Sequence, residues 1–223
     1  MMTNTIQEEF SEIDEGSSNQ VTLDLIKYIE EILPGFRASR EFVDILKKKK
    51  NEDQHSTSLC VYMNNKCKST YCFIPENAQK GIYTIDIGIY QGSILIFTIE
   101  AKLLPTPKGT KNKPRAEHEY VYGKGAGIQR FKDGNHGLDN EDNLFNESGI
   151  IAYIKEQDFE YWFSQVNRWV LDAQWDKSEQ LEKIYFKQIA KLISKHPRQN
   201  DSEVILHHFW IYVSQIQPSQ KEM

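Results

Sequence analysis

The chain has few cysteines and no long apolar segment. Among its 223 residues are three cysteines, Cys60, Cys67 and Cys72, and no two of them form a CxxC pair. This odd number favours reduced thiols over a disulfide framework, and a zinc site that joins them to His55 is the weaker alternative. No apolar run approaches the roughly 18 residues of a membrane-spanning helix, and a signal-peptide pattern is missing at the N-terminus. We therefore expect a soluble, cytoplasmic protein without a membrane partner.

Common nucleotide-binding and nucleophile motifs are also missing. The glycine-rich run at 123–137 reads GKGAGIQRFKDGNHG. It lacks the Gly-Lys-Ser/Thr ending of a P-loop, and its glycine spacing differs from the dinucleotide-binding fingerprint. No Ser-His-Asp or Cys-His arrangement can be singled out. These absences disfavour a P-loop NTPase, a dehydrogenase and a hydrolase with a side-chain nucleophile.

Positive charge is concentrated in one segment. The whole chain has 27 Lys+Arg against 32 Asp+Glu, a net charge of −5. Residues 102–132 contain eight basic and two acidic residues, a net of +6, which leaves −11 for the rest. Such a segment suits a phosphodiester backbone, although its proline and glycine residues also fit a solvated loop. The residues expected to contact nucleic acid are Lys108, Lys111, Lys113, Arg115, Lys124, Arg130 and Lys132.

Three charged residues interrupt two apolar segments in the middle of the chain. Residues 82–90 read IYTIDIGIY and residues 94–103 read ILIFTIEAKL, and both alternate as β-strands do. Asp86 lies in the first segment. Glu100 and Lys102 lie in the second, two residues apart, so they point to the same side. Because a buried charge is unfavourable unless it is paired or binds a metal, these residues predict a functional site.

The connection between the two strands decides whether the charged residues meet. We expect a three-residue hairpin loop at 91–93, which pairs Asp86 with Thr98. Glu100 is then the diagonal neighbour of Asp86, roughly 7–8 Å away. A two- or four-residue loop would place Asp86 on the wrong face. At the expected spacing the two carboxylates can share a hard cation such as Mg²⁺, and Lys102 can contact both the attacking water and the phosphate.

This arrangement resembles the PD-(D/E)XK, or restriction-endonuclease-like, nuclease superfamily over roughly residues 39–156. Asp86 matches the motif aspartate and Glu100-Ala101-Lys102 matches the E-x-K triplet, while Ile85 stands where the motif has proline. The resemblance implies that Asp86, Glu100 and Ala101 hold Mg²⁺, for which Mn²⁺ can substitute, and that Lys102 is catalytic. An isolated E-x-K triplet can also be a solvated ion pair on an exposed strand. The upstream aspartate and the basic segment favour the nuclease interpretation here.

The resemblance also points to the helix that follows the E-x-K strand. Family members often place a glutamine or lysine from this helix beside the metal, and Gln129 is the matching residue. A glutamine on the helix surface is the alternative. Family members often add an acidic residue from a helix before the sheet, and Glu41 is available. For Glu41, however, stabilisation of its own helix is the stronger interpretation.

The predicted architecture is one α/β domain with a mixed central sheet flanked by helices, a restriction-endonuclease-like core with extra N- and C-terminal helices. Residues 1–20 form an acidic tail that we expect to be disordered, and residues 21–223 form the domain. Hydrophobic spacing predicts helices at 25–33, at 39–50 with Ser39 as N-cap, at 159–173 and at 181–193. It predicts further strands near 59–63, 71–74, 149–154 and 204–213, the last with His207 and His208 on opposite faces.

The expected function is Mg²⁺-dependent hydrolysis of phosphodiester bonds. By analogy with the superfamily, DNA is the favoured substrate, and restriction or defence against phage and other foreign DNA is the favoured role. A second copy or a partner subunit could supply recognition. The alternative is a catalytically inactive nuclease-like subunit that binds nucleic acid or a protein in a defence or repair complex. The intact Asp86, Glu100 and Lys102 set favours activity.

Overall fold

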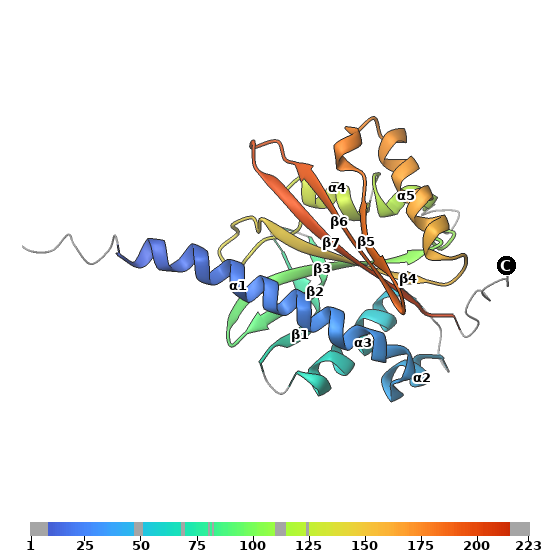
Figure 1. Cartoon of the computed structure of the whole chain (residues 1–223), viewed down its shortest axis with the longest axis horizontal. Helices are drawn as coiled ribbons and strands as arrows, with labels where there is room; N and C mark the ends of the chain where they lie inside the picture. The colour runs from blue at the N-terminus through green and yellow to red at the C-terminus, as the bar shows by residue number, and fades with distance from the viewer. Residues whose placement is uncertain are drawn as a thin grey trace, which may run out of the picture.

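The computed structural model describes the backbone of residues 9–46, 51–67, 70–79, 81, 83–109, 115–123 and 125–214, with side chains from Gln20 onward except at 45–46. Within these residues the chain forms a seven-stranded mixed sheet in the order β1-β2-β3-β4-β7-β6-β5. Helices cover both faces of the sheet, as Figure 1 shows. The expected α/β class with a mixed central sheet is confirmed.

The elements alternate along the chain. The helices are α1 (Glu9–Ile32), α2 (Arg40–Leu46), α3 (Glu52–Lys66), α4 (Gly127–Lys132) and α5 (Phe159–Asp172). The 3-10 segments are η1 (Leu33–Ala38), η2 (Glu117–Tyr120) and η3 (Lys177–Glu179). The strands are β1 (Cys72–Ala78), β2 (Thr84–Gln91), β3 (Ile94–Leu104), β4 (Glu147–Ile154), β5 (Glu182–Phe186), β6 (Ile189–Pro197) and β7 (Glu203–Tyr212). The central pairs β3–β4 and β4–β7 are parallel, and the other pairs are antiparallel.

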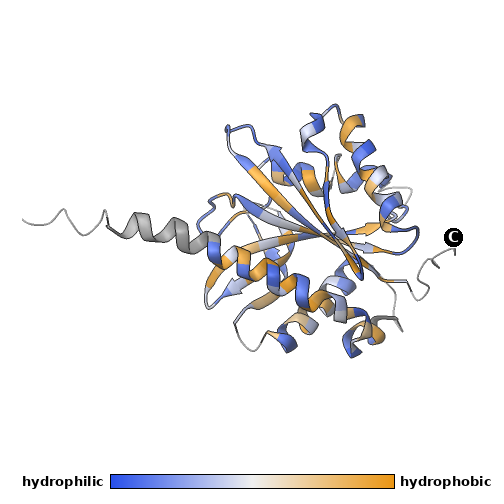
Figure 2. Ribbon diagram, in the orientation of Figure 1, coloured by the Kyte–Doolittle hydropathy of each residue, from blue (hydrophilic) through white to orange (hydrophobic). Residues whose placement is uncertain are grey.

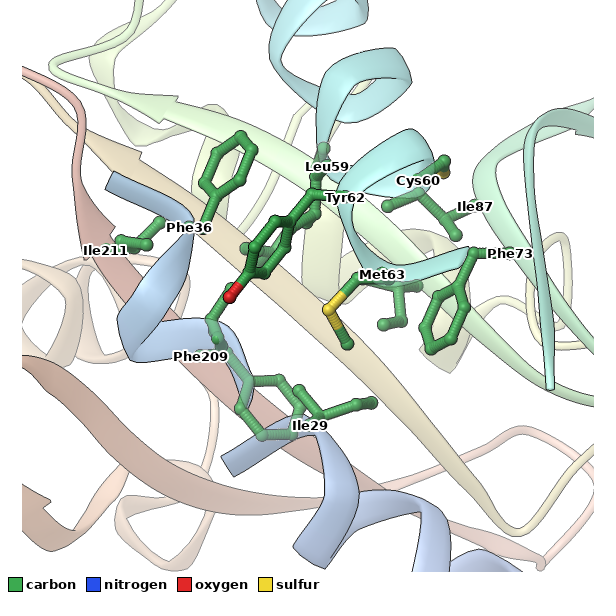
Figure 3. Close-up of a cluster of buried hydrophobic side chains, with 14 of the residues drawn as sticks. Ile29, Phe36, Leu59, Cys60, Tyr62, Met63, Phe73, Ile87, Phe209 and Ile211 are labelled. Carbon is green, nitrogen blue, oxygen red and sulfur yellow. The ribbon is translucent and has the colours of Figure 1, made fainter. Parts of the chain in front are cut away.

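Two hydrophobic clusters lie on opposite faces of the sheet. Helices α1, α2 and α3 cover one face, and α4 and α5 cover the other (Figure 1). Figure 3 shows the first cluster, in which Tyr62 and Met63 of α3 lie over Phe209 and Ile211 of β7. Hydrophobic and hydrophilic residues alternate along α1 and α5 (Figure 2), so each helix can bury one side against the sheet. Within the residues that the structure describes, no helix is long and apolar enough to cross a membrane.

Several predicted elements are confirmed, but two are wrong. Ser39 accepts a hydrogen bond from Phe42 N (3.1 Å) as the N-cap of α2. The apolar run at 59–63, expected to be a strand, lies inside α3, because its buried residues recur at three- and four-residue intervals and Val61 between them is exposed. The expected helix at 181–193 is instead the β5–β6 hairpin, which pairs with β7 through β6. The expected disordered tail at 1–20 overlaps α1 from Glu9 onward, and residues 1–8 lie outside the described part.

A chain of buried polar side chains runs across the sheet under α4 and α5, and its two ends fix the direction of every hydrogen bond. The indole N–H of Trp210 can only donate, and it donates to Tyr120 Oη (2.9 Å). The Tyr120 hydroxyl in turn donates to His208 Nδ1 (2.7 Å). At the other end, burial alone would raise the pKa of Glu179, but hydrogen bonds from His196 and a lysine lower it. The Glu179 carboxylate therefore accepts from His196 Nδ1 (2.9 Å).

Ser194 joins the two halves of this chain. Because His208 Nδ1 accepts, its Nε2 carries the hydrogen and donates to Ser194 Oγ (2.7 Å). Ser194 then donates to His196 Nε2 (2.7 Å). Each neutral histidine is thus held as one tautomer. Protonation of either ring would turn an acceptor into a second donor and break one hydrogen bond of the chain.

We expect this chain to make the fold sensitive to acid. Burial lowers the pKa of His208 well below its ordinary value of 6.5, and it also lowers the pKa of His196. Below pH 6.5 these two histidines therefore bind more protons in the unfolded than in the folded protein, and their contribution to the free energy of unfolding falls as the pH drops. Removing one such histidine should lower the slope of the free energy of unfolding against pH by the equivalent of up to one bound proton, about 1.4 kcal/mol per pH unit. Urea unfolding of wild type and His208→Gln between pH 7.5 and 5.5 measures this slope, and equal slopes would contradict the assignment.

Candidate active site

The two strands that carry the predicted site residues separate at Asp86. The ladder between β2 and β3 ends at the pair Ile87 and Ile99. Beyond it, the Ala101 N–H donates to Asp86 Oδ2 (2.7 Å) instead of to a backbone carbonyl of β2. The next N–H on this edge, that of Leu103, donates to Glu52 Oε2 (2.9 Å) in the first turn of α3. Two carboxylates therefore take the place of a strand along this stretch of β3.

Strand β2 is irregular where it carries Asp86. Ile85 packs in the cluster under α4 and α5, whereas Ile87 packs in the cluster under α1–α3. Regular alternation would place both on one face. On the neighbouring strand β1, Glu76 has a positive φ of 52° between the pairs that involve Ile85 and Ile87. This local twist turns the Asp86 carboxylate toward the edge of β3.

The hairpin loop differs from the prediction, but a second irregularity restores the expected parity. Gln91 pairs with Ile94, so the loop contains only two residues, Gly92 and Ser93. A two-residue loop by itself would place Asp86 on the opposite face of the sheet from Glu100 and Lys102. A β-bulge follows, in which Tyr90 pairs with Leu95 and Ile89 pairs with Phe97, so that Ile96 is the extra residue. The loop length was wrong, and the meeting of Asp86 with β3 depends on the bulge.

Glu100 lies at the centre of a cluster of cations. Its Oε1 atom lies 2.6 Å from Lys102 Nζ and accepts a hydrogen bond from Arg130 Nη1 of α4 (3.0 Å). The side chains of Glu100 and Lys102 are 1% and 5% exposed, whereas that of Arg130 is 31% exposed. Gly127 allows this packing, because a Cβ there would lie 2.9 Å from Tyr120 O and 3.4 Å from Lys102 Cε. The first turn of α4 therefore lies directly against the lysine of the E-x-K triplet.

The second oxygen of Glu100 is not hydrogen-bonded in the described part of the chain. His136 Nδ1 lies 3.2 Å from Glu100 Oε2, but the contact does not have the geometry of a hydrogen bond. Both ring nitrogens of His136 are likewise buried without a hydrogen bond there. Buried carboxylate oxygens normally have a partner. Glu100 Oε2 can thus serve as an oxygen ligand for a bound cation.

The three carboxylates differ in how readily they ionise. Burial raises the pKa of Asp86 well above 3.8, and repulsion from Glu100 adds to this shift. Burial also raises the pKa of Glu52. Burial opposes ionisation of Glu100 too, but its contacts with Lys102, His136 and Arg130 lower its pKa below 4.5. Burial would lower the pKa of Lys102, yet the three carboxylates, Glu100 first, raise it above 10.5. Lys102 is therefore a cation at neutral pH.

The available ligands fit a hard divalent cation. Within the described ranges, no three His, Cys, Asp or Glu side chains converge at metal-binding distances. Mg²⁺, however, is typically held by one or two carboxylates together with waters and substrate phosphate. Asp86 and Glu100 Oε2 supply such oxygens. The Ala101 carbonyl lies on the same edge as the Ala101 N–H that Asp86 binds, because both groups of an extended residue point to one neighbour.

Two residues of this cluster were not predicted from the sequence. Glu52 follows Asn51, which caps α3 by accepting from Gln54 N (3.0 Å), so the helix start was a signal that could have found it. The candidate from an earlier helix, Glu41, is instead hydrogen-bonded to Asn65 (2.8 Å) and to its own backbone N–H, which lowers its pKa. For His136, the sequence contains no indication of a place in the site other than its position in the glycine-rich run at 123–137.

The other predicted residues are divided between the site and its surroundings. Gln129 accepts from Gly123 N (2.8 Å) and so braces the glycine-rich loop, while its neighbour Arg130 reaches Glu100. Arg115 pairs with Glu119 (2.7 Å) and lies 3.9 Å from Glu52. Lys132 pairs with Glu179 and lies over the Trp175 ring (4.0 Å). Lys108 is exposed, and Lys111, Lys113 and Lys124 lie outside the described residues.

No family model, curated protein or solved structure matches this chain. Membership of the PD-(D/E)XK superfamily therefore stays a prediction from the motif residues Asp86, Glu100 and Lys102.

We expect Asp86→Asn to stabilise the free protein. Because its pKa is raised in the fold, Asp86 contributes stability below pH 3.8 that is lost as the pH rises through the raised pKa. At pH 7.5 the asparagine, which can still accept from Ala101 N, should increase the free energy of unfolding by about 1 kcal/mol. The gain should disappear toward pH 4, and added Mg²⁺ should stabilise wild type but not the variant.

The control for this variant is Asp133→Asn, which makes the same change at an exposed position just after α4. Its effect should stay within about 0.5 kcal/mol. Urea unfolding with and without Mg²⁺ measures both variants. An Asp86→Asn protein that is less stable than wild type at pH 7.5 would contradict the electrostatic interpretation of this site.

Proposed function

We propose that this protein is a Mg²⁺-dependent nuclease of the PD-(D/E)XK type that hydrolyses phosphodiester bonds of DNA. The observation that carries the proposal is the separation of β2 from β3, which brings the carboxylates of Asp86 and Glu52 to the edge of the strand that bears Glu100 and Lys102. Separated hairpin strands with acidic groups between them leave strand-edge carbonyls and carboxylates open to one ligand. That combination suits a phosphate accompanied by a hard cation.

The proposed residue roles follow from charge and burial. Asp86 and Glu100 would hold Mg²⁺ with the Ala101 carbonyl, and Glu52 lies at the same edge. When bound, Mg²⁺ would supply Lewis-acid stabilisation of the phosphate and a more acidic water. Lys102 keeps its proton at neutral pH, since its pKa is raised. It therefore acts as a cation that orients the attacking water and stabilises negative charge on the phosphate, rather than as a base.

The basic residues favour a nucleic-acid substrate. Arg115 and Arg130 are partly exposed, and each is paired with a carboxylate of the site cluster or lies close to one. A phosphate backbone that reaches this strand edge would meet the positive charge of both arginines. We propose DNA as the substrate and restriction, or defence against phage and other foreign DNA, as the role in the cytoplasm. A second copy or a partner subunit would then supply recognition.

One observation favours the second candidate function, an inactive nuclease-like subunit that binds nucleic acid or a protein partner. Glu100 Oε1 is engaged by two cations, Lys102 and Arg130, in the manner of a buried structural ion cluster. If this cluster never opens, the residues serve stability and not catalysis. Incubation with plasmid, linear duplex, single-stranded DNA and RNA, each with Mg²⁺, Mn²⁺ or EDTA, separates the two functions.

We expect Lys102→Met to reduce metal-dependent cleavage by at least ~100-fold, because it removes the cation beside the reacting phosphate and retains the aliphatic chain. Single-turnover rates with plasmid DNA measure the loss. Lys195→Ala, at an exposed position on β6, is the control and should cleave at the wild-type rate. Equal rates for Lys102→Met and wild type, with thermal unfolding confirming that both are folded, would rule out this site as the source of the activity.

A further inference from the structure

Lys102 and Arg130 both contact the same oxygen of Glu100, Oε1, but they differ in how tightly the surrounding residues enclose them. Lys102 is enclosed by the first turn of α4 and by β4: a Cβ at Gly127 would lie close to both Lys102 Cε and Ile150 Cδ1. Arg130 approaches the same oxygen from the surface, with 31% of its side chain exposed. The ammonium is thus confined to the site, whereas the guanidinium can move out of it.

The surroundings of Arg130 leave space for such a movement. Its Nη2 atom lies over Gly125, where a Cβ would be 3.7 Å away and where the φ of 90° suits glycine. The helix that carries it, α4, has only six residues. No side chain at 125 packs on this side of the guanidinium, and 31% of the Arg130 side chain is open to solvent.

A cation at Glu100 and the guanidinium of Arg130 compete for the same carboxylate. A divalent cation bound through Glu100 Oε2 places two positive charges beside Arg130, within the same buried carboxylate group. Repulsion between the bound cation and Arg130 is stronger in a site of low solvent content than in water. It displaces Arg130, because the guanidinium is the more mobile of the two. The carboxylate that neutralised Arg130 is at the same time neutralised by the new cation. Arg130 then needs another anion, and a planar guanidinium suits a phosphate.

We propose that Arg130 couples metal binding to nucleic-acid binding: it neutralises Glu100 in the free protein, and the incoming cation releases it to bind a phosphate of the substrate. This inference rests on the proposed function. It explains why a carboxylate expected to hold a metal is paired with two cations in the free protein. By linkage, the factor by which the metal strengthens DNA binding equals the factor by which DNA strengthens metal binding.

The experiment measures that coupling factor in the absence of turnover. Ca²⁺ binding is followed by isothermal titration calorimetry with and without a short DNA duplex, and electrophoresis confirms that the duplex stays intact. For wild type we expect the duplex to tighten Ca²⁺ binding by at least ~5-fold. Arg130→Gln should bind Ca²⁺ more tightly than wild type without DNA, since the competing cation is gone. Its coupling factor should fall below the wild-type value, to the part that direct contact between the cation and a phosphate supplies.

Arg168→Gln is the matched control, because it removes the same charge from an exposed position on α5. It should keep the wild-type coupling factor. Arg130→Lys retains charge but loses the planar fork, and its coupling factor should lie between those of wild type and Arg130→Gln. Thermal unfolding shows whether each variant is folded under the conditions of the titration.

Three outcomes would overturn the inference. A wild-type coupling factor in folded Arg130→Gln would show that the guanidinium is not the coupling group. A coupling factor of one in wild type would overturn the inference, while Mg²⁺-dependent cleavage of DNA by the same protein would leave the proposed nuclease activity standing without a role for Arg130 in coupling. If Ca²⁺ binding to wild type is absent or is unchanged by Asp86→Asn, the proposed metal site itself is wrong, and the nuclease assignment fails with it.

Discussion

The hydrogen bond from the Ala101 N–H to the Asp86 carboxylate is the interaction on which the site depends. An N–H on the edge of a strand needs an acceptor, and here a charged side chain supplies it in place of the neighbouring strand. This substitution lets β2 turn away while β3 continues in the sheet toward β4. The opened edge then has room for a second carboxylate, that of Glu52 at the start of α3.

The candidate site contains buried carboxylates whose electrostatic interactions are unfavourable, and the surrounding fold holds them in place. Burial and mutual repulsion raise the pKa values of Asp86 and Glu52, while Glu100 is balanced by Lys102 and Arg130. Buried ion pairs of this kind often contribute less to stability than apolar residues of similar volume would. The chain of hydrogen bonds through Ser194 is equally buried, but every one of its hydrogen bonds has a defined donor and acceptor. Within one domain, one buried polar network has its hydrogen bonds satisfied, whereas the other leaves Glu100 Oε2 and both ring nitrogens of His136 without a hydrogen bond among the described residues.

Much of the fold could be predicted wherever local periodicity and burial agreed. The alternation at 84–91 and 94–104 identified both site strands, and the helical spacing of α5 and the strand at 203–212 were also recognised. Prediction failed where the apolar spacing suited two structures. Residues 181–193 have intervals of three and four, as in a helix, yet their partner is β7, and Ile184 remains 56% exposed on the edge strand. Pairing between successive strands, β5 with β6 and β6 with β7, outweighed the helical spacing.

The order of residues along the chain was enough to identify Asp86, Glu100 and Lys102 as members of one proposed site and to place Glu100 and Lys102 on one face, because strand periodicity assigns side chains to faces without reference to the rest of the molecule. It did not reveal the two-residue loop or the bulge that compensates for it, since neither changes the hydrophobic pattern. Glu52, Arg130 and His136 joined the site only through folding. They are separated from the strand residues they approach by 51, 30 and 36 positions, respectively, and contacts over such distances are set by packing between elements that no local pattern encodes.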